Sequence, residues 1–338
     1  NKLMQEKYAL DDEMLKPYFK LENVQKGVFD LATRLYGITF KEVNNIPLYH
    51  PEVKTYEVYD NDGSFLAVLY TDFFPRESKG GGAWMTQFRG QKMVDGKDQR
   101  PLVSLVMNFT KPTDTKPSLL TFNEVTTFLH EFGHALHGMF SKCTYGSTSM
   151  DGVSRDFVEL PSQFMENYAL EKEWLDTWAV HYQTGEKIPQ EYIDKIKKSS
   201  NFQAGYASDR QLSFGMVDMA WHTITEPVTE PLADFEQRAM GKTEIMPLVK
   251  GSAFSPAFGH IFAGGYAAGY YGYKWAEVLD ADAFSLFKQN GIFDKATAES
   301  FRRNVLEKGA SENPMTLYKR FRGQEPTVDA LLERSGLK

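Results

Sequence analysis

Cysteine, long apolar runs and blocks of charge of one sign are all scarce in this sequence. Cys143 is the only cysteine among the 338 residues, so no disulfide can form within the chain. No segment approaches 18 continuous apolar residues, and the first 30 residues lack the layout of a signal peptide. The 38 basic residues are interspersed with 45 acidic ones, so we expect neither nucleic acid nor a membrane as a partner.

The composition, with 42% hydrophobic and 14% aromatic residues, is typical of a globular protein, and the chain is long enough for one large core or two. The chain begins at Asn1 and runs at once into a helical pattern that has no N-terminal cap. We therefore expect a longer protein of which this is the C-terminal part. Its expected location is the cytoplasm, with the periplasm or secretion as the alternative if a signal segment precedes Asn1.

The spacing of apolar residues divides the chain into three regions. Residues 1–50 are predicted to form a helical scaffold, in which Gly37 ends one helix. Residues 54–110 show the period of strands, with a turn at 60–63, and are predicted to form a small antiparallel sheet. The remainder, 121–338, is predicted to be helical and to carry the chemistry.

Residues 76–91 interrupt the strand pattern with three consecutive glycines, in the run RESKGGGAWMTQFRGQ. Glycine permits backbone conformations and close approaches that other residues block. One interpretation is a rim or strand that meets an extended peptide backbone, and the other is a flexible surface loop.

The run TFNEVTTFLHEFGHALHGMF, residues 121–140, has the three-and-four spacing of an amphipathic helix, begun by a capping box. His130 and His134 lie one turn apart on one face, about 5–6 Å apart at Cβ, so both imidazoles can bind one cation. Glu131 lies about 100° around the helix, where it can reach a zinc-bound water. H-E-x-x-H on a helix is a metalloprotease signature, although two ordinary helix histidines would match it too.

A third ligand must come from elsewhere in the chain. His137 shares the histidine face but lies about 10 Å along the axis from His130, too far for the same ion. A third histidine six residues after the second is excluded, because residue 140 is phenylalanine. Glu159, 25 residues past His134, is the best-placed acid. Two histidines and a glutamate leave one position open for water, which is typical of a catalytic zinc site.

Glu159 and Glu166 fall on one face of a second predicted helix, whose start depends on Pro161. Glu166 is our candidate acceptor for the ring N–H of a ligand histidine, an interaction that commonly orients such ligands.

The stretch from Phe254 is rich in glycine and aromatic residues. The pair Gly264-Gly265 predicts a flexible entry, after which three phenols are spaced to share one helical face near His260. These are Tyr266, Tyr270 and Tyr273. They form either an aromatic core stripe or, with the imidazole, a set of donors for the oxyanion of a tetrahedral intermediate.

The segments HEFGHALHGMF, FVELPSQFMENY and HIFAGGYAAGYYGYKW resemble the three signature blocks of the thimet oligopeptidase family of zinc metallopeptidases. The forms HGMFS, RDFVE and HIFAGGYAAGYY are most similar to its bacterial peptidyl-dipeptidase (dipeptidyl carboxypeptidase) branch. The resemblance runs through essentially the whole chain. It implies one zinc ion bound by His130, His134 and Glu159, Glu131 as the general base, and contact with the substrate or its oxyanion by Tyr266, Tyr273 and His260.

The resemblance also implies a mainly α fold: a zincin-like helical catalytic lobe with a small sheet, half of a two-lobed clamshell with a deep channel. Family members are about twice this length, so the missing N-terminal lobe is an expected partner. Further predicted substrate contacts are Tyr270, Gly264, Gly265 and Arg155. Arg155 could grip a free C-terminal carboxylate through two parallel bonds, or form an ordinary surface ion pair.

The predicted reaction is therefore zinc-dependent hydrolysis of short peptides with release of C-terminal dipeptides. An endo-acting oligopeptidase of the same family is the alternative. A non-catalytic, zinc-stabilised fragment that only binds peptides is the alternative of another class.

Overall fold

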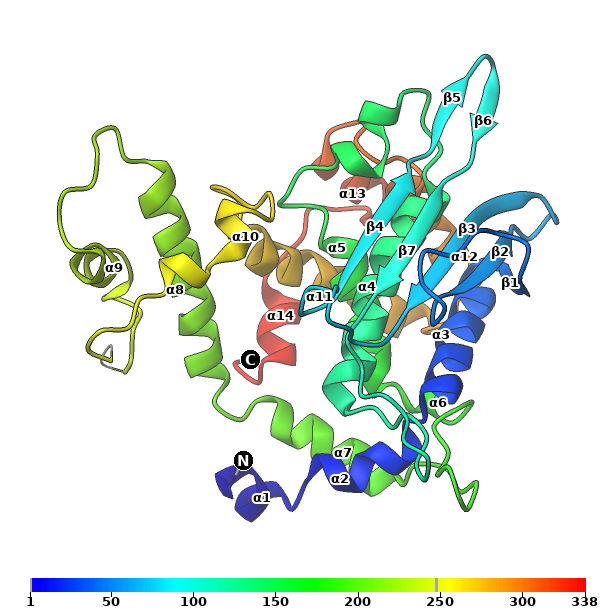
Figure 1. Ribbon diagram of the computed structural model, residues 1–338, viewed down its shortest axis with the longest axis horizontal. Helices are drawn as coiled ribbons and strands as arrows, with labels where there is room; N and C mark the ends of the chain where they lie inside the picture. The colour runs from blue at the N-terminus through cyan, green and yellow to red at the C-terminus, as the bar shows by residue number, and fades with distance from the viewer. Residues whose placement is uncertain (1, 247–248) are drawn as a thin grey trace.

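The computed structural model describes residues 2–246 and 249–338. A mainly helical body carries a five-stranded sheet and a two-stranded sheet at one edge, and a second group of helices stands to the opposite side (Figure 1). The predicted mainly α fold with a small sheet is confirmed. No helix within the described ranges combines the length and apolar character that a membrane span needs.

The N-terminal helices form the scaffold that the sequence predicted. They are α1 (Lys2–Tyr8), α2 (Asp12–Leu15) and α3 (Leu21–Tyr36). Gly37 ends α3 with a φ of +76°, the left-handed conformation that glycine adopts without cost. The helical region is shorter than predicted, because the first strand begins at Thr39 within the 1–50 segment.

The main sheet has the strand order β1-β2-β3-β7-β4. Its strands are β1 (Thr39–Val43), β2 (Lys54–Tyr59), β3 (Phe65–Asp72), β4 (Trp84–Arg89) and β7 (Leu102–Val106). The prediction of an antiparallel sheet is wrong at one pair, because β3 and β7 run parallel. A parallel pair needs a long crossover, and here it contains β4 and the hairpin of β5 (Lys92–Val94) and β6 (Lys97–Gln99).

Helix α4 (Phe122–Phe140) packs on the sheet, and its N-terminus carries the predicted capping box between Thr121 and Glu124. Helix α5 (Leu160–Glu166) crosses α4 at Gly133. A Cβ on Gly133 would lie 2.3 Å from the backbone oxygen of Pro161, so only glycine permits this approach. The contact brings the two elements that carry the predicted ligands together.

The remaining helices pack on this body or stand beside it. Those on the body are α6 (Lys172–Leu175), α7 (Gln190–Ser200), α11 (Gly272–Asn290), α12 (Lys295–Phe301), α13 (Pro314–Arg322) and α14 (Asp329–Arg334). The side unit consists of α8 (Ala204–His222), α9 (Leu232–Met240) and α10 (Gly259–Phe262), at the left of Figure 1. It has its own small apolar cluster, of Val217, Phe235, Met240, Phe258, Ile261 and Tyr270.

Candidate metal centre

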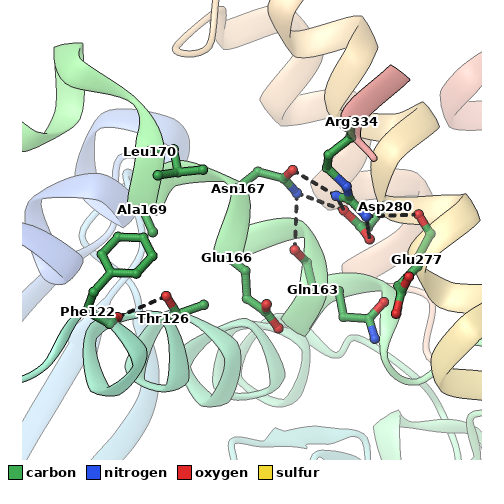
Figure 2. Close-up of a pocket in the computed structure, with 10 residues that line it drawn as sticks. All are labelled: Phe122, Thr126, Gln163, Glu166, Asn167, Ala169, Leu170, Glu277, Asp280 and Arg334. Carbon is green, nitrogen blue, oxygen red and sulfur yellow. Dashed lines mark hydrogen bonds and ion pairs between the residues drawn. The ribbon is translucent and has the colours of Figure 1, made fainter. Parts of the chain in front are cut away.

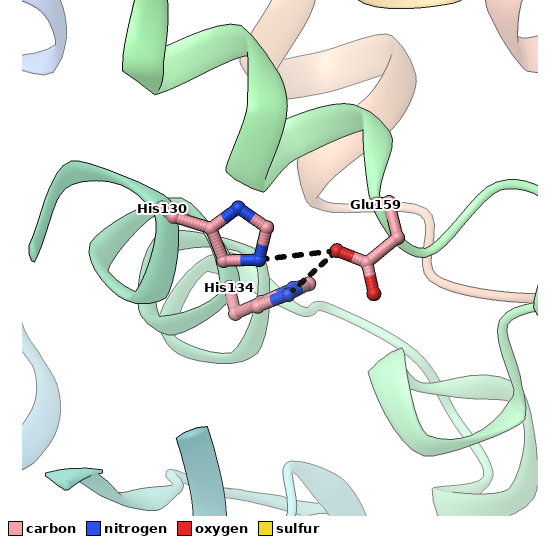
Figure 3. A group of neighbouring side chains, drawn as sticks. All are labelled: His130, His134 and Glu159. Carbon is pink, nitrogen blue, oxygen red and sulfur yellow. Dashed lines mark ion pairs between the residues drawn. The ribbon is translucent and has the colours of Figure 1, made fainter. Parts of the chain in front are cut away.

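Three predicted ligands converge between α4 and α5 (Figure 3). The Oε2 atom of Glu159 lies 3.3 Å from His130 Nε2 and 3.1 Å from His134 Nε2. A tetrahedral ion with bonds of about 2.0–2.1 Å separates its ligand atoms by roughly 3.3 Å. These two separations match those of a tetrahedral zinc site, and all three ligand atoms lie within 4.8 Å of one another.

Local structure fixes the orientation of Glu159. The residue directly precedes α5, Pro161 occupies the first turn as the sequence allowed, and the side chain is only 1% exposed. The hydroxyl of Ser162 donates to Glu159 Oε2 over 2.8 Å. Sequence reasoning missed Ser162, although its place three residues after the ligand, in the first turn of a helix, was a usable signal.

The carboxylate and the imidazoles at this site shift one another's pKa values. Burial raises the pKa of Glu159, but the two imidazoles outweigh it and hold that pKa well below its ordinary value. Burial lowers the pKa of His130, but hydrogen bonds with Glu159 and Glu166 hold it well above the ordinary value. Metal binding at imidazole and carboxylate ligands competes with protons, so the affinity of this group for a metal ion depends on pH.

His137 is not part of this group, as its axial distance predicted. Its side chain is fully buried, and burial lowers its pKa to about 3, so the ring is neutral.

Glu166 contacts a ligand histidine on the side away from the metal position. Its Oε1 atom lies 2.6 Å from His130 Nδ1, the contact that the sequence analysis predicted. Glu166 also lines a pocket of about 300 Å³ between α4, α5, α11 and α14 (Figure 2). In the lining of the same pocket, Asn167 and Arg334 both bond to the buried carboxylate of Asp280, which ties the end of α5 to α11 and α14 (Figure 2).

Replacing Glu166 with alanine is expected to weaken metal binding by about 10–100-fold, because the ring of His130 loses the acceptor that orients it. The measurement is competition with a chromophoric chelator. Glu277→Ala is the matched control, since Glu277 lines the same pocket but pairs with Lys274. Equal metal affinity in the wild type and Glu166→Ala would contradict this role.

Glu131 lies on α4 between the two histidines and faces β4. Burial raises the pKa of its carboxyl, against the histidines and the backbone N–H of Met85, which lower it. A carboxylate of raised basicity beside a metal position is suited to accept a proton from water.

Strand β4 is the edge of the sheet, and one side of it is free of any described partner strand. The segment of consecutive glycines before it is held in place, because Asn108 Nδ2 donates to the backbone oxygens of Gly80 (2.9 Å) and Gly82 (2.7 Å). The strand interpretation of residues 76–91 is thus confirmed at β4. Contact of this edge with a peptide stays a prediction.

The tyrosine-rich segment before α11 consists of turns and not of the predicted helix. Tyr266 does not share a helical face with Tyr273, because α11 begins only at Gly272 and the residues before it form turns. Positive φ angles at Gly265 (+79°) and Ala268 (+51°) prevent a helix there. This prediction of a continuous helix was wrong.

The turns nevertheless bring two of the tyrosines together beside Glu159. The hydroxyl of Tyr266 donates to Glu159 Oε1 over 2.6 Å, and its ring stacks on that of Tyr273 with centroids 5.0 Å apart. The centre of the His260 ring lies 6.0 Å from that of Tyr266 and 6.1 Å from that of Tyr273. Tyr270 points elsewhere, since its hydroxyl bonds to Gln211 of α8.

Arg155 lies against this segment, with its guanidinium carbon 5.0 Å from the centre of the Tyr266 ring. A Cβ on Gly265 would lie 3.0 Å from Arg155 Nη2, and one on Gly264 would lie 3.0 Å from the His260 backbone. Both glycines therefore serve close packing. Arg155 itself is exposed and pairs with no carboxylate among the described residues, so the surface ion pair considered as an alternative is absent there.

Similarity to known peptidases extends along nearly the whole chain. The model of "Peptidase family M3" matches residues 1–337. Oligopeptidase A of Escherichia coli K12 is 45% identical over 100% of this chain, and dipeptidyl carboxypeptidase of Salmonella typhimurium is 43% identical over 98%. The chain spans about half of their length, 50% and 49% respectively.

Solved structures support the fold alone. An M32 carboxypeptidase from Deinococcus radiodurans R1 superposes with a TM-score of 0.57 at 17% identity, over 96% of this chain and 61% of the other.

Proposed function

This chain belongs to peptidase family M3, and from that premise we propose that it hydrolyses peptide bonds in short peptides with one bound zinc ion. The observation that carries the proposal is the convergence of His130, His134 and Glu159, with Glu131 beside them. We further propose that the reaction releases C-terminal dipeptides. The substrate would lie between this lobe and an N-terminal lobe, which together make the two-lobed clamshell.

A zinc ion bound by the three ligands would lower the pKa of a water molecule toward about 7 and polarise the scissile carbonyl. Glu131 accepts the proton of the attacking water and later donates it to the leaving amine. Tyr273 would donate a hydrogen bond to the oxygen that becomes negative, and Tyr266, whose ring stacks on that of Tyr273, would join it when its hydroxyl turns from Glu159 to the substrate. The free edge of β4 would pair with the extended peptide backbone.

Arg155 supports the dipeptide-releasing form of the proposal. A guanidinium that has no acidic partner within residues 2–246 and 249–338, and that lies over the ring of a predicted catalytic tyrosine, is available for the substrate's terminal carboxylate. The similarity to a protein named oligopeptidase A favours the alternative, an endo-acting enzyme that ignores the free terminus.

The test compares an unblocked octapeptide with the same peptide amidated at its C-terminus, with products identified by mass spectrometry. A dipeptide-releasing enzyme should yield dipeptides stepwise and lose about tenfold or more in kcat/KM on amidation, the value of one hydrogen bond between charged groups. Arg155→Gln should cause a similar loss on the free acid and little on the amide. Equal rates on both peptides would establish the endo-acting alternative, and no cleavage at all would leave a peptide-binding fragment.

A further inference from the structure

A buried carboxylate on α8 holds the turns that carry the predicted oxyanion donors. Asp218 is fully buried, and each of its oxygens accepts one backbone N–H from those turns. Ala268 N donates to Oδ1 and Tyr270 N to Oδ2, both over 2.9 Å. One side chain thus satisfies two backbone donors that no helix or strand provides for.

These turns need such support. Ala268 has a φ of +51°, a left-handed conformation that residues with a Cβ disfavour, and it lies two residues after Tyr266. The hydrogen bond at its N–H is the direct restraint on that conformation. Without it, the backbone between Tyr266 and Tyr273 is free to relax toward an ordinary φ.

Asp218 is itself oriented by the next turn of α8. His222 Nδ1 lies 2.8 Å from the backbone oxygen of Asp218, its hydrogen-bond partner, and also 2.8 Å from Asp218 Oδ1. The His222 ring lies 6.1 Å from that of Phe262 on α10. The ring therefore lies directly against the carboxylate that accepts from the turns. This contact gives His222 a definite structural partner.

The opposite side of the segment is attached to the metal centre. Tyr266 bonds to Glu159, and Gln163 Nε2 donates to the backbone oxygen of Tyr273 over 3.1 Å. The turns are thus hydrogen-bonded on one side to Glu159 and α5 and on the other side to Asp218 of α8. Small changes at Asp218 should move the two hydroxyls relative to the metal position.

We propose that Asp218 is a positioning residue: through the backbone of Ala268 and Tyr270 it places the hydroxyls of Tyr266 and Tyr273 at the metal centre. His222 assists by fixing the carboxylate. The catalytic consequence rests on the proposed peptidase function, whereas the restraint on the turns does not.

The experiment uses the intact, zinc-loaded protein and three variants. Asp218→Asn keeps the shape but turns one acceptor into a donor that faces a backbone N–H. His222→Phe removes the orienting nitrogen and retains a ring beside Phe262. Asp282→Asn is the control for lost stability, because Asp282 is an equally buried acid on α11 that instead accepts from Tyr318 at 2.6 Å.

Amide hydrogen exchange and steady-state kinetics are then measured together with zinc content. In Asp218→Asn, the peptide spanning 264–272 should exchange at least about tenfold faster, and kcat should fall about 10–100-fold with KM within about threefold. Zinc content should stay unchanged, and His222→Phe should show a smaller loss of the same kind. In a Tyr266→Phe, Tyr273→Phe background, Asp218→Asn should cost less than about threefold, because it acts through those hydroxyls.

Several results would overturn the proposal. Unchanged exchange over 264–272 would show that Asp218 does not restrain the turns. Faster exchange with unchanged kcat would remove the positioning role, and an equal kcat loss in Asp282→Asn would reduce it to general destabilisation. An inactive parent protein would refute the peptidase function, and with it the positioning role, while the exchange data would still decide the restraint.

Discussion

Glu131→Gln is expected to lower kcat by about 10²–10⁴-fold, the usual contribution of a general acid or base. Glutamine has the same shape but cannot accept the proton of the attacking water. Glu131 is buried, which raises its pKa, so bulk water cannot readily act as the base in its place. Because Glu131 is not one of the three converging ligands, the variant should retain its zinc.

The measurement is kcat on an unblocked peptide, together with zinc content from atomic absorption. Glu124→Gln is the matched control on the same helix, because glutamine also completes a capping box at this position. We expect this control to keep wild-type activity. If Glu131→Gln keeps more than about a tenth of wild-type kcat, the general base must be sought elsewhere.

Tyr266→Phe and Tyr273→Phe are each expected to lower kcat by about 10²–10³-fold, the cost of removing one donor to an oxyanion. The two should differ in a second property. Of the two tyrosines, Tyr266 is the one that donates to the predicted ligand Glu159, so its loss should also weaken zinc binding, whereas Tyr273→Phe should leave zinc affinity unchanged.

Tyr271→Phe provides the control for this pair. Tyr271 lies in the same turns, but its hydroxyl bonds to Asp156 and the side chain is exposed. Its loss should change kcat by less than about threefold, as for an exposed hydrogen bond. A similar kcat in all three variants would show that the stacked tyrosines have no special part in the reaction.

Local patterns predicted those parts of the site that lie within one helix. The capping box at Thr121, the period of α4 and the spacing of His130 and His134 depend only on neighbours in sequence. The end of α3 at Gly37 was readable for the same reason. The resemblance in three blocks extended this to the family, which the match over residues 1–337 confirms.

Long-range contacts account for what the sequence did not reveal. The parallel pairing of β3 with β7 depends on where a crossover returns, which no strand period encodes. The turns between Tyr266 and Tyr271 have helical spacing in the sequence, yet two positive φ angles and the distant Asp218 decide their shape. Tertiary contacts overrode local propensity at this point.

The sequence by itself therefore determined the family, the motif helix and which three side chains converge. Only the tertiary structure decided how they meet: Gly133 allows α5 to approach α4, and that approach brings Glu159 within 3.3 Å of both imidazoles. It also assigned Tyr266 to the metal side and Tyr270 to α8. The physical reason is that helix periodicity is a property of adjacent residues, whereas a metal centre is a set of distances between separate elements.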